Sequence, residues 1–142
     1  MTRARHQPIV NMIPQRHIAD CGPTCLAMFL GVTYEDALLA FEDGSHVIRH
    51  GVWFPDLQRA AEKLGATMVV KRRPDLDLDD GILKIEFKNK RADTHVVVLR
   101  EGVLFDTDLT AWKPDDYCAA KRAKTGALLI RKDDEDTQSE AQ

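Results

Sequence analysis

The sequence predicts a single α+β domain, with helices in its first half and strands in its second. Up to residue 64, apolar residues recur at helical spacing between proline and glycine signals, whereas from residue 66 onward β-branched residues gather in short runs. At 142 residues and 44% hydrophobic, the chain is long enough for one core and hardly for two. We therefore expect one domain over residues 1–132.

Proline, threonine and glycine mark the ends of the expected helices. Pro23 and Pro55 suit a first helical turn, where a missing N–H leaves no hydrogen bond unmade. Thr33 resembles the start of a capping box, and Gly31 and Gly65 are natural helix ends. We expect helices at about 23–30, 34–41 and 55–64, with a loop between the last two.

The second half is expected to be a set of short strands joined by turns. Its apolar runs are rich in valine, isoleucine and leucine and are separated by charged or glycine-containing segments. The expected strands are 67–71, 83–87, 94–99, 103–106 and 127–130. An acidic connector at 75–81 separates the first two. The acidic segment 133–142 has no apolar residue larger than alanine, so we expect a disordered tail there.

The strands 94–99 and 103–106 flank Glu101-Gly102, which predicts a tight hairpin. A two-residue turn would put His95, Asp106 and Asp108 on the same face of the sheet, because strand side chains alternate with period two. Opposed or diagonal neighbours then lie within reach of one another. Either aspartate can therefore orient the imidazole, whereas a three-residue turn would send both to the other face.

Cys21 stands where an extended segment meets the first expected helix. A helix N-terminus presents unpaired N–H groups and partial positive charge, which favour a thiolate over a thiol. Gln15, six residues upstream, offers an amide donor for an oxyanion. Because cysteine is also among the most buried residue types, Cys21 as a simple core residue is the alternative. We expect Cys25 and Cys118 to be core or incidental residues.

Five parts of the chain, in this order, resemble the C39 family of papain-like cysteine peptidases. They are Gln15 and the segments 20–28, 51–65, 94–99 and 103–106. The resemblance spans roughly residues 8 to 131. It implies a papain-like fold, in which N-terminal helices pack against a C-terminal antiparallel sheet, and a site in the cleft between them. It also implies a thiol hydrolase that cuts a peptide bond and needs no cofactor or metal.

The resemblance also implies a role for each candidate site residue. Cys21 is the nucleophile, His95 the general base and acid, Asp106 the orienting acid and Gln15 an oxyanion donor. Members of this family are typically fused to membrane exporters and cut leader peptides after a double glycine. This chain lacks the exporter parts, and it has Thr94 and Thr107 where the family favours glycine and proline.

Charge and composition exclude several other classes of protein. The formal net charge of −3 argues against a general binder of nucleic acid or anionic membranes, since such binding needs a basic excess. No apolar run approaches the roughly 18 residues of a membrane span, and no secretory signal is present. Three cysteines cannot all pair, so we expect a cytoplasmic protein with free thiols. Its partner is then a peptide or protein substrate with an extended segment, and its oligomeric state is open.

Three rival interpretations use the same residues. His17 and Cys21, Cys21 and Cys25, and His46 and His50 each stand four apart, as zinc ligands on a helix do. No second C-x2–4-C pair accompanies them, however, which disfavours a structural zinc site. The second rival is a catalytically idle C39-like module that holds a peptide. The third is an acyltransferase in which an amine replaces water at the same cysteine site.

Overall fold

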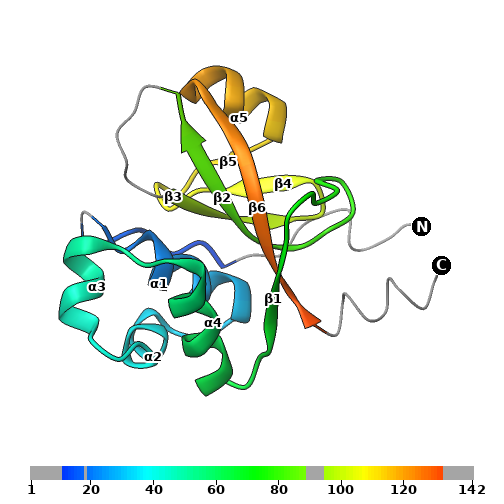
Figure 1. Cartoon of the computed structure of the whole chain (residues 1–142). Coiled ribbons are helices and arrows are strands. Elements are labelled where there is room, and N and C mark those ends of the chain that lie inside the picture. The colour runs from blue at the N-terminus through cyan, green and yellow to red at the C-terminus, as the bar shows by residue number, and fades with distance from the viewer. Residues whose placement is uncertain (1–10, 18, 89–94, 133–142) are drawn as a thin grey trace.

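The computed structural model describes residues 11–17, 19–88 and 95–132. The expected tail, 133–142, and Thr94 lie outside these residues. In chain order the elements are α1 (Cys21–Leu30), α2 (Tyr34–Leu39), α3 (Gly44–His50), α4 (Phe54–Lys63), β1 (Met68–Lys71), β2 (Gly81–Phe87), β3 (His95–Arg100), β4 (Val103–Phe105), β5 (Ala111–Trp112), α5 (Pro114–Lys121) and β6 (Ala123–Arg131). Figure 1 shows α1 to α4 gathered on one side of the strands, with α5 at the far end of the sheet.

The helices α1, α2 and α4 begin and end close to the predicted positions. α1 stops at Gly31, whose φ of 74° is the left-handed conformation that glycine adopts without strain. α2 starts after Thr33, whose side chain accepts a hydrogen bond of 3.0 Å from the Asp36 N–H. Gly65, with φ of 93°, follows the end of α4. Local end signals therefore fix these three helices.

α3 is a helix where the sequence predicted a loop, so that prediction was wrong. The Asp43 side chain caps the helix by accepting a hydrogen bond of 3.1 Å from the His46 N–H. Gly44 is the first residue of α3. Only Val47 is buried, so the helix carries no apolar stripe that a periodicity argument detects.

The six strands form one sheet in the order β1-β6-β2-β3-β4-β5, and every pairing is antiparallel. The tight hairpin is confirmed: Arg100 pairs with Val103, so the turn has two residues, the length that would put His95 and Asp106 on the same face of the sheet. Glu101 and Gly102 have φ of 50° and 80°, as a type I′ hairpin turn requires at both central positions. The α+β class predicted from the sequence is confirmed.

The second half contains two elements that the sequence analysis did not predict, β5 and α5. β5 is only two residues long and pairs with β4. α5 begins at Pro114, has two aspartates in its first turn and ends with Lys121 in its last turn. β6 is also longer than the expected strand and lies between β1 and β2 in the sheet.

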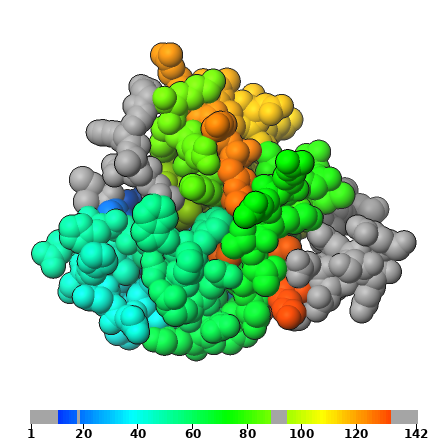
Figure 2. Space-filling model, viewed as in Figure 1, coloured from blue at the N-terminus to red at the C-terminus, as the bar shows by residue number. Residues whose placement is uncertain are grey.

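Both faces of the sheet are covered. The face toward α1, α2 and α4 contributes Ile82, Val96, Val98, Phe105 and Leu129 to the larger core. The other face contributes Leu83, Ile85, Val97, Leu104 and Leu128 to a smaller core with Tyr117 of α5. In Figure 2 the cyan and teal helical part lies below the green and orange strands.

The first helix is the central element, since every residue of α1 except Leu30 is buried. The Cys25 thiol donates a 3.3 Å hydrogen bond to the Val96 carbonyl, which holds the N-terminal half of α1 beside the start of β3. This contact brings Cys21 and His95, the first residues of α1 and β3, to the same region. Across the described ranges, no helix is long and apolar enough to cross a membrane.

Candidate active site

Cys21 is the first residue of α1 and is 7% exposed. The next residue must be small, because a Cβ added at Gly22 would lie 2.3 Å from Cγ2 of Val52. Glycine therefore lets the segment before α4 pack directly against the start of α1. This close approach fixes the start of α1, where Cys21 stands.

Asp20, for which the sequence predicted no role, fixes the loop before α1. It is fully buried, and its carboxylate accepts hydrogen bonds from the N–H of Arg16 (3.3 Å), the N–H of His17 (3.1 Å) and the hydroxyl of Tyr34 (2.6 Å). Its backbone carbonyl accepts from the Thr24 hydroxyl at 2.8 Å. An aspartate just before a helix suggests a side-chain cap, but this side chain turns back to hold the loop that follows Gln15.

His95 lies between the two other predicted members of the triad. Its Nε2 is 2.9 Å from Oδ1 of Asp106, and its ring also forms a hydrogen bond with the side chain of Cys21. Burial alone would lower the pKa of His95, but the hydrogen bonds and negative charges of Asp106 and Cys21 raise it to about 9. The site therefore favours an imidazolium beside the sulfur at neutral pH.

Asp106 is the aspartate that contacts His95. Although burial opposes it, the hydrogen bond and charge of His95 lower the pKa of Asp106, helped by the Thr107 N–H at 2.7 Å and the Tyr117 hydroxyl at 2.9 Å. Asp108, the alternative that the sequence left open, instead accepts hydrogen bonds from the N–H and the hydroxyl of Thr110. Of the two candidates, Asp106 and not Asp108 is therefore the carboxylate that contacts His95.

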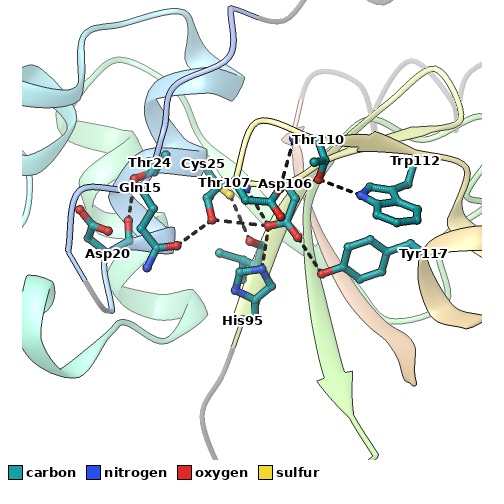
Figure 3. A network of polar contacts seen from close by, with 12 residues as sticks. Gln15, Asp20, Thr24, Cys25, His95, Asp106, Thr107, Thr110, Trp112 and Tyr117 are labelled. Carbon is teal, nitrogen blue, oxygen red and sulfur yellow. Dashed lines mark hydrogen bonds and ion pairs between the residues drawn. The ribbon is translucent and has the colours of Figure 1, made fainter. Parts of the chain in front are cut away.

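Gln15 is tied to the end of β4 at two points, as Figure 3 shows for its side chain. Its backbone N–H donates to the Thr107 carbonyl at 2.9 Å, and its side-chain Oε1 accepts from the Thr107 hydroxyl at 2.7 Å. Its Nε2 donates to the His17 carbonyl at 2.7 Å. The amide is therefore held next to the loop that leads into Cys21.

The structure thus brings Cys21, His95 and Asp106 into one chain of side-chain contacts, and it links Gln15 to that chain through Thr107. Sequence reasoning missed the contributions of Thr107 and Tyr117. Thr107 had only the signal of standing where proline is usual, and Tyr117 had none, because its helix was not predicted.

Residues of the cysteine and histidine pairs that suggested a zinc site make other contacts in the structure. Cys25 is fully buried, and burial, followed by the charges of Cys21 and Asp106, raises its pKa well above the usual value, which makes it an unreactive thiol. The ring centroids of His46 and His50 on α3 lie 4.7 Å apart, with the ring planes tilted by 34°. Within the described ranges, no group of three or more His, Cys, Asp or Glu side chains is arranged to hold a metal.

Comparison with known proteins bears on the fold of the chain. No protein-family model matches the chain, and no curated protein matches it in sequence. It is similar in structure to a double glycine motif protease from an AMS/PCAT transporter, whose crystal structure was solved in complex with the leader peptide. The two share 22% identity with a TM-score of 0.63, over 87% of this chain and 91% of that one. The similarity confirms the predicted papain-like, C39-like fold.

Proposed function

We propose that this protein is a cysteine peptidase of C39 type that hydrolyses a peptide bond with Cys21 as nucleophile. The observation that carries the proposal is the contact series from Cys21 through His95 to the buried carboxylate of Asp106. A thiol at a helix start, a protonated imidazole and an orienting acid are the components of nucleophilic catalysis by cysteine. The likeness to a protease fold supports the same assignment.

In the proposed reaction, the Cys21 thiolate attacks the carbonyl carbon of the scissile bond. The negative charge that develops on the carbonyl oxygen is stabilised by the Cys21 backbone N–H and the Gln15 Nε2. His95 gives its proton to the leaving amine, which departs and leaves a thioester on Cys21. His95 then takes a proton from water, the resulting hydroxide attacks the thioester, and the acid product and the thiolate–imidazolium pair are formed.

Asp106 acts through His95 in this scheme. Its carboxylate holds Nε2 of the imidazole, so the ring keeps one orientation while it gives and takes the proton on its other side. The Tyr117 hydroxyl and the Thr107 N–H keep the carboxylate in place. Since Tyr117 comes from α5 and Thr107 from the turn that follows β4, the acid is held by two separate parts of the fold.

We propose a peptide with an extended segment as the substrate, cut after a double glycine. The support is the similar structure, a double glycine motif protease solved with a leader peptide. We place the activity in the cytoplasm, because the three cysteines, all within the described residues, form no disulfide.

The test combines labelling with cleavage in a Cys118→Ser background, which removes the more exposed of the two other thiols. Alkylation of Cys21 by iodoacetamide is followed over pH 5 to 10 in the parent and in His95→Ala. We expect the substitution to slow alkylation at neutral pH, because it removes the imidazolium that favours the thiolate. An alkylation profile that is unchanged in His95→Ala would refute an activated nucleophile.

The second half of the test is cleavage, followed by mass spectrometry, of peptides with Gly-Gly or Ala-Ala before the scissile bond. We expect cleavage of the Gly-Gly peptide by the parent and none by Cys21→Ala. Normal labelling without cleavage of any peptide would favour the idle peptide-binding module. Product formed only when an amine is added would favour the acyltransferase.

A further inference from the structure

Thr107 connects the two halves of the candidate site. Its hydroxyl lies 2.7 Å from Oε1 of Gln15 and 3.4 Å from Oδ1 of Asp106, and its N–H donates to the same Asp106 oxygen at 2.7 Å. Its carbonyl accepts the backbone N–H of Gln15 at 2.9 Å. Thr107 is 4% exposed, so these contacts are largely shielded from water.

The hydroxyl has one hydrogen to donate, and the distances assign it to Gln15. Oε1 of Gln15 can only accept, and it lies 0.7 Å closer to the hydroxyl than the Asp106 oxygen does. Asp106 already accepts from the N–H of Thr107 itself and from His95. The side chain of Thr107 therefore acts on Gln15, and its backbone acts on Asp106.

The direction of the Gln15 amide matters because its two ends have opposite chemistry. Only the NH₂ end can stabilise an oxyanion, whereas the oxygen end would repel it. The Thr107 hydroxyl binds the oxygen end and the His17 carbonyl binds the NH₂ end. Rotating the amide by 180° would put Oε1 against the His17 carbonyl, two acceptors with no hydrogen between them. The contacts at both ends therefore select one orientation.

We propose that Thr107 is a positioning residue whose hydroxyl fixes the orientation of the Gln15 amide, so that the Gln15 NH₂ group is available to the developing oxyanion. The inference rests on the proposed function of Cys21 and Gln15. Proline, the residue that the resemblance leads one to expect at this position, has neither a hydroxyl nor an N–H to donate. Threonine supplies both contacts in this chain.

The test compares two reactions of Cys21 that differ in their need for an oxyanion site. Iodoacetamide is attacked at a saturated carbon: the C–S bond forms, iodide leaves and no oxyanion arises. p-Nitrophenyl acetate is attacked at its carbonyl: a tetrahedral oxyanion forms, then p-nitrophenolate leaves and an acetyl thioester remains. Both rates are measured at pH 7 in a Cys118→Ser background, and the rate of Cys21→Ala is subtracted from each.

Thr107→Val removes the hydroxyl but keeps the shape and the backbone N–H, and Thr107→Ser keeps the hydroxyl. We expect Thr107→Val to slow acylation about tenfold with an unchanged alkylation rate, since one imperfectly placed oxyanion donor costs less than its complete loss. Thr107→Ser should retain the parent's acylation rate. In a Gln15→Ala background, Thr107→Val should have no further effect, because the group that it positions is gone.

Four results would overturn the inference. Equal slowing of acylation and alkylation in Thr107→Val would mean that the hydroxyl acts through the His95–Asp106 pair. Unchanged acylation in Thr107→Val, or an additive effect with Gln15→Ala, would mean that it does not position the amide. A parent protein that alkylates at Cys21 but acylates no faster than Cys21→Ala would refute the proposed function itself, and the inference with it.

Discussion

At the scale of single residues, the contact between His95 and Asp106 sets the upper pH limit of the proposed reaction. His95 must carry a proton to give to the leaving amine, and its pKa is raised to about 9. The rate should therefore fall as pH rises through about 9. In Asp106→Asn the hydrogen bond and charge of the carboxylate are lost. The pH at which the rate falls should therefore move down toward the ordinary histidine pKa of 6.5. The measurement is kcat/KM for peptide cleavage over pH 5 to 10.

Asp108→Asn provides the matched control, because it makes the same chemical change two residues away. Asp108 accepts hydrogen bonds from Thr110, so the rate of this variant should fall at the same high pH as that of the parent. An equal shift of the falling part of the pH profile in both variants would show that general negative charge, and not the contact with His95, determines the pKa of His95.

A second prediction at this scale concerns the glycine beside the nucleophile. In Gly22→Ala the new Cβ would lie 2.3 Å from Cγ2 of Val52, so Val52 or the start of α1 must shift. We expect the free energy of unfolding to fall by about 1–3 kcal/mol, the usual cost of overpacking. Adding Val52→Ala should restore part of that loss, as urea unfolding would show. Purely additive losses in the double variant would mean that the two side chains do not compete for this space.

At the scale of elements, α1, α2, α4 and the β3–β4 hairpin were predictable because their end signals are local. Capping threonine, left-handed glycines and a two-residue turn act within a few residues of one another. α3 was missed because only Val47 of this helix is buried, and α5 because Tyr117 is its only buried residue. Neither helix shows the apolar stripe on which a periodicity argument depends.

The candidate site likewise contains some residues that local signals identify and others that they do not. Cys21 and the hairpin aspartates were found because they stand at recognisable local positions. The contact of Thr107 with Gln15 joins residues 92 positions apart, and Tyr117 reaches Asp106 from a helix that was not predicted. No local pattern encodes such contacts, since they exist only after the sheet and the helices have packed together.

The helix α5 is coupled to the site through one hydroxyl, which gives an element-scale prediction. In Tyr117→Phe the ring still fills the core, but Asp106 loses a hydrogen bond of 2.9 Å. We expect the free energy of unfolding at pH 7 to fall by about 1.5–3 kcal/mol, as for hydrogen bonds to charged groups. Because that bond favours the ionised carboxylate, the difference from the parent should shrink below pH 4, as urea unfolding at both pH values would show. An equal loss of unfolding free energy at pH 7 and below pH 4 would point to lost packing instead of a lost hydrogen bond.

At the scale of the whole molecule, the candidate site exists only where the two parts of the fold meet. The loop and helix before residue 31 supply Gln15 and Cys21, and the sheet supplies His95 and Asp106. Figure 1 shows α1 against the sheet, and the Cys25–Val96 hydrogen bond ties the two parts together. Folding and assembly of the site are therefore one event, and ionisation of the site must affect the stability of the whole chain.

The direction of that effect follows from the two pKa shifts. The raised pKa of His95 gives stability that is fully present below pH 6.5 and is lost as pH rises through about 9. The lowered pKa of Asp106 gives stability that is present above its ordinary value of 3.8 and is lost as pH falls further. We expect the contribution of this pair to be greatest between about pH 4 and 6.5 and to decline from 6.5 to 9. Urea unfolding at pH 5.5, 7.5 and 9 should show the decline in the parent and a shallower one in His95→Gln, because glutamine does not titrate. Parallel pH profiles in the two proteins would contradict the assignment of this ionisation to His95.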